Sequence, residues 1–122
     1  MGTPALLTIT DEYGEQVFYR RHYDGYPSHV MPNLAPVLER IRAVGSNDSY
    51  GLRISDVAAL VAWVGVEEEQ AYAKDRVDIG LPNFGKMSTW LQIDEEYAHR
   101  GYFSHYYVLD LETLSLYEFM NA

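Results

Sequence analysis

The chain opens with two segments in which apolar and polar residues alternate. Residues 5–10 alternate aliphatic residues with threonine, which is the period of a half-buried β-strand. Residues 11–15 favour a turn, in which Gly14 is free to adopt a positive φ. Residues 16–22 then form a second alternating segment, so the pattern predicts an N-terminal hairpin. Its second strand has two faces, Val17, Tyr19 and Arg21 on one side and Phe18, Arg20 and His22 on the other.

Two helical patterns follow the hairpin. Residues 33–44 carry apolar residues at spacings of three and four, and Asn33 is placed to cap the helix. The second pattern covers residues 55–74, with Ser55 as the expected N-cap. Residues 57–66 are apolar nearly all round, which predicts a helix in the centre of the molecule.

In the remainder of the chain, the pattern predicts secondary structure weakly in one region and strongly in another. Residues 76–90 contain glycine, proline and asparagine, and predict a long loop that serves as a contact surface. Residues 90–93 fit either a short strand or the start of a helix, and are followed by the acidic run Asp94-Glu95-Glu96. Residues 102–110 and 114–120 are rich in aromatic and β-favouring residues, and predict a second hairpin.

This order of elements predicts the α+β class. We expect a single domain over residues 1–122, with an antiparallel sheet of about four strands (two hairpins) and two helices packed on one face. The longest apolar run is ten residues, short of the roughly 18 that a membrane span needs. Because the N-terminus lacks a basic region before an apolar core, we expect no signal peptide and a cytoplasmic location.

The net charge of the chain indicates which class of partner it binds. Eighteen carboxylates against nine basic residues give a formal net charge of −9, which repels phosphate backbones and attracts basic protein surfaces. The sequence therefore predicts a protein partner with a basic surface, and no direct contact with nucleic acid or membrane. The alternative is that the excess acid only keeps the protein soluble. The candidate partner-binding residues are Glu67, Glu68, Glu69, Asp94, Glu95 and Glu96.

The most distinctive stretch is residues 19–27, where a strand pattern gives way to a turn. Asp24 is expected to accept hydrogen bonds within the turn and to pair with an arginine, and Gly25 to adopt a conformation barred to other residues. Tyr26 is expected to pack inward, and Pro27 to stiffen the exit from the turn. The residues assigned to this structural turn are Tyr19, Arg20, Arg21, His22, Asp24, Gly25, Tyr26 and Pro27.

No constellation in the sequence identifies a reaction, so we assign no catalytic residue, metal or cofactor. The chain has no cysteine and no phosphate-binding glycine loop. His22, Asp24 and His29 could together ligate a metal, but we favour a structural role in which His22 is a strand residue bonded to Asp24 or to a backbone carbonyl. An enzyme that uses Arg20, Arg21, His22 and Asp24 as an acid–base set stays open as an alternative.

The stretch Tyr-Arg-Arg-His-Tyr-Asp-Gly-Tyr-Pro at residues 19–27, together with the tyrosine-rich residues 106–112, resembles a group of small phage- and prophage-borne proteins of unknown function. The resemblance implies an origin in a mobile element. We therefore expect a non-enzymatic binding module that inhibits a host nucleic-acid-binding complex by occupying a basic surface, as anti-CRISPR inhibitors do. The alternative is a phage structural or assembly protein that self-associates through its sheet edges.

Overall fold

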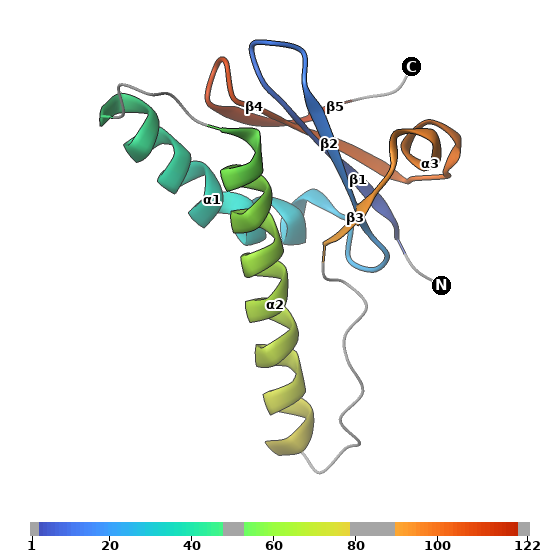
Figure 1. Cartoon of the computed structure of the whole chain (residues 1–122). Helices are drawn as coiled ribbons and strands as arrows, with labels where there is room; N and C mark the ends of the chain where they lie inside the picture. The colour runs from blue at the N-terminus through green and yellow to red at the C-terminus, as the bar shows by residue number, and fades with distance from the viewer. Residues whose placement is uncertain (1–2, 48–52, 79–89, 120–122) are drawn as a thin grey trace.

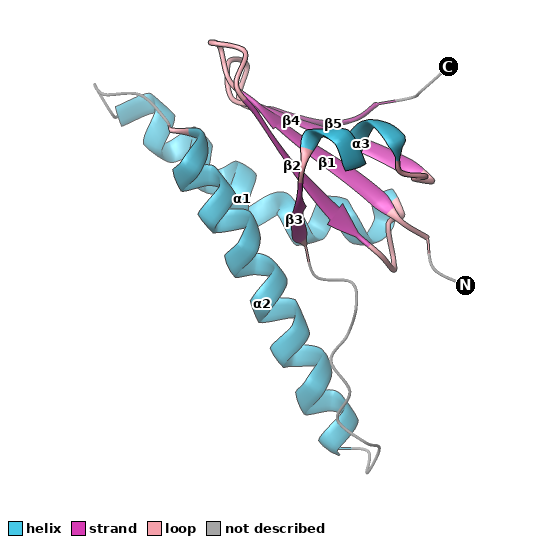
Figure 2. Cartoon of the chain, turned by 45° about the vertical axis from the view of Figure 1, so that its right-hand side comes forward, coloured by secondary structure: helices cyan, strands magenta, loops and turns pink. Residues whose placement is uncertain are grey.

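The structure is a computed structural model that describes residues 3–47, 53–78 and 90–119, with the backbone alone for residues 46–47, 69 and 72–78. The elements are β1 (Ala5–Thr10), β2 (Gln16–Arg21), α1 (Pro27–Asn47), α2 (Ile54–Asp78), β3 (Leu91–Ile93), α3 (Glu95–Arg100), β4 (His105–Asp110) and β5 (Ser115–Phe119). The α+β class is confirmed. Figures 1 and 2 show α1 and α2 on one face of the sheet and the short α3 on the other.

The sheet differs from the predicted one in two respects. It has five strands in the order β3-β2-β1-β4-β5, because the predicted strand-or-helix segment after Trp90 pairs with β2 as an edge strand. It is also mixed: both predicted hairpins form, but they join through a parallel pairing of β1 with β4. After α2 the chain passes through β3 and α3 before β4. β4 begins beside the first residue of β1, where Ala5 pairs with His105, so the two strands run in the same direction.

The main core lies between the sheet and the two long helices. The alternation predicted for the first hairpin is confirmed, since Leu7, Ile9 and Tyr19 face this core and are buried. The helices contribute buried aliphatic side chains at helical spacing, namely Val30, Leu34, Val37 and Ile41 from α1 and Val57, Val61 and Val64 from α2.

A smaller core on the opposite face holds α3 against the sheet. Leu6, Phe18, Ala98 and Phe103 are buried together there. This helix was not predicted, and its signal was present in the acidic run: Asp94 is the N-cap, and its Oδ1 accepts a hydrogen bond of 2.7 Å from the backbone N–H of Tyr97.

The long helices begin earlier than predicted. Proline is favoured in the first turn of a helix, because its missing N–H has no partner there, and α1 begins at Pro27 rather than near Asn33. Ser55 lies inside α2, which begins at Ile54, and residues 76–78 extend that helix instead of forming a loop. The rest of the predicted loop, residues 79–89, lies outside the described residues.

The prediction that α2 is buried on all sides is wrong. The helix packs one stripe against the core and turns another outward, where Trp63 is 59% exposed and Val66 is 45% exposed. The reason is its position at the outside of the helical layer, with no further layer beyond it (Figure 2). No helix within the described ranges is both long and apolar enough to cross a membrane.

The turn after β2 needs a glycine for a reason that differs from the predicted one. The left-handed conformation belongs to Asp24, which has a φ of 56°. Gly25 instead lies against the N-terminal segment, where its N–H donates to the carbonyl oxygen of Thr3 at 2.9 Å. A Cβ at this position would stand 2.4 Å from that oxygen and 2.9 Å from the Cβ of Ala5.

Gly25→Ala is therefore expected to lower the free energy of unfolding by about 1–3 kcal/mol, because the backbone must move to admit the methyl group. Urea unfolding measures the effect. Asp24→Asn is the matched control, since asparagine tolerates the left-handed region, and it should cost less. An alanine variant as stable as the parent would show that the close contact is not required.

Candidate binding site

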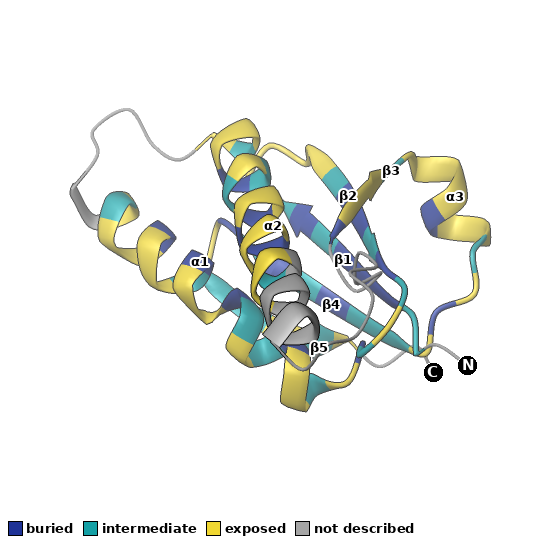
Figure 3. Ribbon diagram, turned by 90° about the horizontal axis from the view of Figure 1, so that it is seen from below, coloured by how far each residue is buried: buried dark blue, intermediate teal, exposed yellow. Residues whose placement is uncertain are grey.

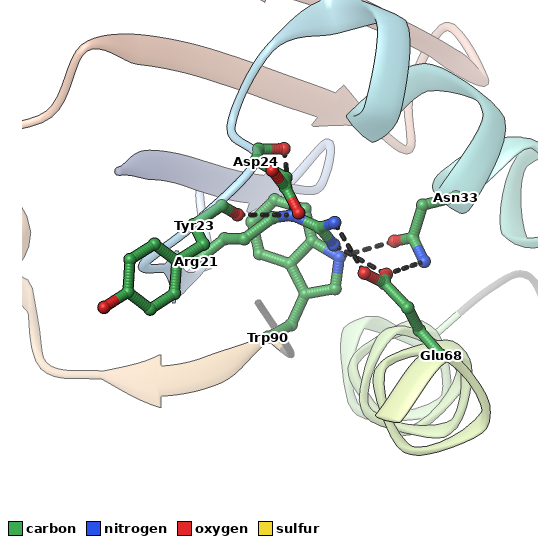
Figure 4. Close-up of polar contacts among 6 residues, drawn as sticks. All are labelled: Arg21, Tyr23, Asp24, Asn33, Glu68 and Trp90. Carbon is green, nitrogen blue, oxygen red and sulfur yellow. Dashed lines mark hydrogen bonds and ion pairs between the residues drawn. The ribbon is translucent and has the colours of Figure 1, made fainter. Parts of the chain in front are cut away.

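Arg21 is the centre of the largest polar network in the described structure. Its side chain is 2% exposed, and the guanidinium bonds the Glu68 carboxylate with both terminal nitrogens, at 2.7 and 2.9 Å. Its Nε donates to the carbonyl oxygens of Tyr23 at 3.1 Å and Asp24 at 3.2 Å (Figure 4). A buried charge is tolerated only when it is paired and hydrogen-bonded, and Arg21 meets both conditions.

Asn33 and Trp90 complete this network. Asn33 donates from Nδ2 to Glu68 at 2.8 Å and accepts the indole N–H of Trp90 at 2.8 Å (Figure 4). The Arg21 guanidinium also lies 5.5 Å from the centre of the Trp90 ring, within range of a cation–π contact. The network joins β2, α1, α2 and the residue before β3, so it fixes how the helical layer sits on the sheet.

This geometry bears on two expectations from the sequence. Glu68 was assigned to partner binding, but its carboxylate is bound inside the molecule by Arg21 and Asn33. Asp24 was expected to pair with an arginine, and Arg21 donates to its backbone carbonyl oxygen. The expected pairing of the Asp24 side chain stays a prediction. Sequence separations of 35 to 57 residues between Asn33 and its partners explain why periodicity could not reveal this set.

The other residues of the turn stretch do not converge on a reaction centre. Arg20 donates to Nδ1 of His22 at 2.6 Å, so His22 bonds neither Asp24 nor a backbone carbonyl as expected. Tyr26 does not pack inward: it is 48% exposed and lies against the rings of His29 and His105. Among residues 3–47, 53–78 and 90–119, no three His, Asp or Glu side chains are grouped closely enough to hold a metal.

Two buried tyrosine hydroxyls tie the sheet to the turn and to α2. Tyr107 donates to the carbonyl oxygen of Gly25 at 2.6 Å, and Tyr19 donates to that of Ala58 at 2.9 Å. Burial raises the pKa of Tyr19. Burial and the negative charge of Glu118 raise the pKa of Tyr107 far above the ordinary value of 10.0, and Arg21 offsets a part of that rise.

The two tyrosines predict a loss of stability in alkali. In the unfolded chain both ionise near pH 10, whereas the raised pKa values make the folded protein lose these protons only at higher pH. Their contribution is therefore complete below about pH 10 and falls above it, by about 1.4 kcal/mol per pH unit for each tyrosine that stays protonated. Urea unfolding at a series of pH values from 8 to about 11.5 measures the slope. Tyr107→Phe should reduce it, and equal slopes in parent and variant would contradict this assignment.

The face of the sheet opposite the long helices carries a groove, which we call the open groove, of about 450 Å³. It runs over the sheet beside α3, and its described lining contains no carboxylate. Tyr117 and Phe119 on β5 are 43% and 50% exposed along it. The side chains that face it from the sheet are mainly apolar or uncharged, namely Leu6, Thr8, Thr10, Gln16, Phe18, Tyr106, Val108, Tyr117 and Phe119, with Ala98 and His99 from α3.

Carboxylates border the open groove on two sides, at one end of the sheet and in a cleft beside it. The β1–β2 and β4–β5 turns lie at the same end of the sheet, because β1 and β4 are parallel, and both turns are acidic. A second cleft of about 310 Å³ shares Gln16 and Phe18 with the groove and is lined by Asp94 and Glu95. We call this set the acidic rim: Asp11, Glu12, Glu15, Asp94, Glu95, Glu96, Asp110 and Glu112.

The rim includes only part of the acidic set predicted from the sequence. Asp94, Glu95 and Glu96 belong to it, with Glu95 3.6 Å from His99 and Glu96 3.5 Å from Arg100 in exposed pairs that contribute little to stability. Glu67 is exposed but lies on α2, and the side chain of Glu69 is outside the described set. The turn acids were missed because their approach to the groove depends on the parallel pairing of β1 with β4.

Fold and site together define an α+β protein with one helix-covered sheet face and one open face that carries an apolar groove with an acidic rim. No protein family model matches the chain, and no curated protein or solved structure gives a significant match.

Proposed function

We propose that this protein is a non-enzymatic binding module that takes a basic segment of a partner protein into the open groove. The observation that supports this most directly is the difference in charge between the groove and its borders. The described groove lining holds no carboxylate, whereas Asp94 and Glu95 line the adjoining cleft and the two acidic turns lie at one end of the sheet. An apolar floor provides binding free energy through buried area, and the charged rim selects the sign of the partner.

The distribution of basic residues supports the same proposal. Arg21 is buried and paired, and Arg40, Arg42 and Arg53 belong to the helical layer. Among the described side chains on the groove side, Arg20 shares the β2 face of Phe18, and Arg100 lies beside Glu96. These two arginines face a rim of eight carboxylates. The negative potential at the groove is therefore only weakly compensated, which disfavours phosphate groups and favours lysine and arginine.

The partner class follows from this potential. Proteins that handle nucleic acids present basic surfaces, and an acidic module that covers such a surface competes with the nucleic acid. We propose this mode of inhibition, of the anti-CRISPR type, for a phage-borne protein in a host cell. Exposed tyrosines near the groove, Tyr97 at 42% and Tyr102 at 83%, provide aromatic anchors of the kind found at binding hot spots.

A peptide titration tests the groove directly. The probe is a synthetic peptide of about twelve residues that alternates lysine with phenylalanine, long enough in extended form to cross the sheet. We expect binding with a Kd in the range of roughly 10–100 μM at low salt, weaker by about tenfold or more in 0.5 M NaCl. Amide NMR shifts should concentrate on Thr8, Val108 and Tyr117. The matched peptide with glutamate in place of lysine should not bind, and equal binding of both peptides would contradict the proposal.

A further inference from the structure

The outer side of α2 carries an apolar stripe that the fold leaves uncovered. Val57, Val61 and Val64 face the core, while Ala59, Ala62, Trp63 and Val66 are exposed on other sides of the same helix. Figure 3 shows both buried and exposed positions along the described part of α2. The exposed positions are spaced by three, four and seven residues, which is the spacing of a helix contact face.

This stripe combines one large side chain with small neighbours. Trp63 is 59% exposed, and two alanines, Ala59 and Ala62, lie within one turn of it. A contact between two copies of one surface must be self-complementary, so that a protrusion of each copy fits a depression in the other. A tryptophan beside alanines meets that requirement, because the indole of one helix fits over the small residues of the other.

We propose that the outer stripe of α2 binds the same stripe of a second copy, in an antiparallel pair related by a two-fold axis. With Trp63 of one copy opposite Ala59 of the other, the axis passes near Val61. Position 53 of one helix then lies opposite position 69 of the second helix. Arg53 of one copy is therefore two residues, or about 3 Å along the helix axis, from Glu67 of the other. Both side chains are exposed, and their opposite charges flank the apolar contact on each side.

The pair leaves the open groove free. The long helices cover the face of the sheet opposite to α3 and the groove (Figure 2), so the two grooves of a dimer face away from the contact. The dimer is thus independent of the function proposed for the groove, and it would present two copies of that site. In this proposal the protein self-associates through a helix surface, and not through the sheet edges named in the alternative from the sequence.

The dimer and the binding of a basic peptide are expected to respond to salt in opposite directions. Each copy carries a formal net charge of −9, so repulsion between copies opposes the dimer, and added salt screens that repulsion. We expect the dimer to become tighter as salt increases, whereas binding of a basic peptide to the groove becomes weaker. Failure of one proposal is therefore visible without reference to the other.

Sedimentation equilibrium of the full chain over a range of concentrations at 50 mM and 500 mM NaCl tests the dimer. Trp63→Ser is expected to weaken it by about 50-fold or more, as for a central aromatic anchor. Tyr102→Ser removes another exposed aromatic residue, 83% exposed, and should leave the dimer unchanged. A monomer at every concentration and salt, or equal dimerisation of Trp63→Ser and the parent, would overturn the inference.

Two further measurements test the dimer even if the Trp63→Ser variant misfolds. The chain has two tryptophans, and Trp90 is already buried, so a blue shift of emission with rising concentration reports the burial of Trp63. Arg53→Glu and Glu67→Arg should each weaken the dimer, and their combination should restore it to within about fivefold of the parent. Failure of the combination to restore the dimer would exclude the antiparallel arrangement.

Discussion

Replacing Glu68 with alanine is expected to lower the free energy of unfolding by about 3–5 kcal/mol, the cost of leaving one member of a buried ion pair without its partner. The Arg21 side chain is 2% exposed and has two of its three donor nitrogens on the Glu68 carboxylate. Asn33 also loses its acceptor for Nδ2 in this variant. The guanidinium would have to recruit water or leave the core, and either response loosens the contact of α2 with the sheet.

Chemical denaturation of three variants distinguishes a lost ion pair from a general effect on α2. Glu67→Ala changes the preceding, exposed carboxylate of the same helix and should alter stability by less than about 0.5 kcal/mol. The double variant Arg21→Met with Glu68→Leu removes both charges and should recover most of the loss, because matched apolar residues replace a buried pair at little cost. If Glu68→Ala were as stable as Glu67→Ala, the network would not hold the two layers together.

Thr8→Arg is expected to abolish binding of the lysine–phenylalanine peptide, by about 100-fold or more, which corresponds to about 2.7 kcal/mol. Thr8 lies on β1 between its cross-strand neighbours Phe18 on β2 and Val108 on β4, and all three line the open groove. An arginine here fills the groove and places a positive charge where the acidic rim is proposed to receive one from the partner. Both the lost space and the added positive charge oppose binding of the lysine–phenylalanine peptide.

The control for this variant carries the same charge change elsewhere. Ser28 is exposed on α1, in the helical layer, so Ser28→Arg should bind the peptide within about threefold of the parent. Isothermal titration calorimetry gives both affinities, and circular dichroism verifies that each variant is folded. Equal loss of binding in the two variants would show that net charge alone, and not the groove, governs the interaction.

Local patterns predicted most of the elements but not their arrangement. The alternation in residues 16–22 correctly placed Tyr19 and Arg21 on one face and Phe18 on the other. The same reasoning failed for α2, since an apolar composition all round does not say how many neighbours the fold supplies. The short α3 was missed although Asp94 has the residue type and position of an N-cap.

The candidate site was less predictable than the fold. Asp94, Glu95 and Glu96 were singled out by their charge, and the first two line a cleft that adjoins the open groove. The groove itself could not be foreseen, because its lining combines β1, β2, β4, β5 and α3. Glu68 was misassigned for a related reason: charge in a sequence looks the same whether a side chain faces water or a buried arginine.

The sequence by itself determined the class, the strand faces and the excess of acid, because these depend on residue type and on spacing over a few positions. Only the tertiary structure decided that β1 pairs in parallel with β4, that Glu68 neutralises Arg21, and that acidic residues border the groove on the open sheet face on two sides. Each of these joins residues that are tens of positions apart, and such contacts form only when the whole chain has packed.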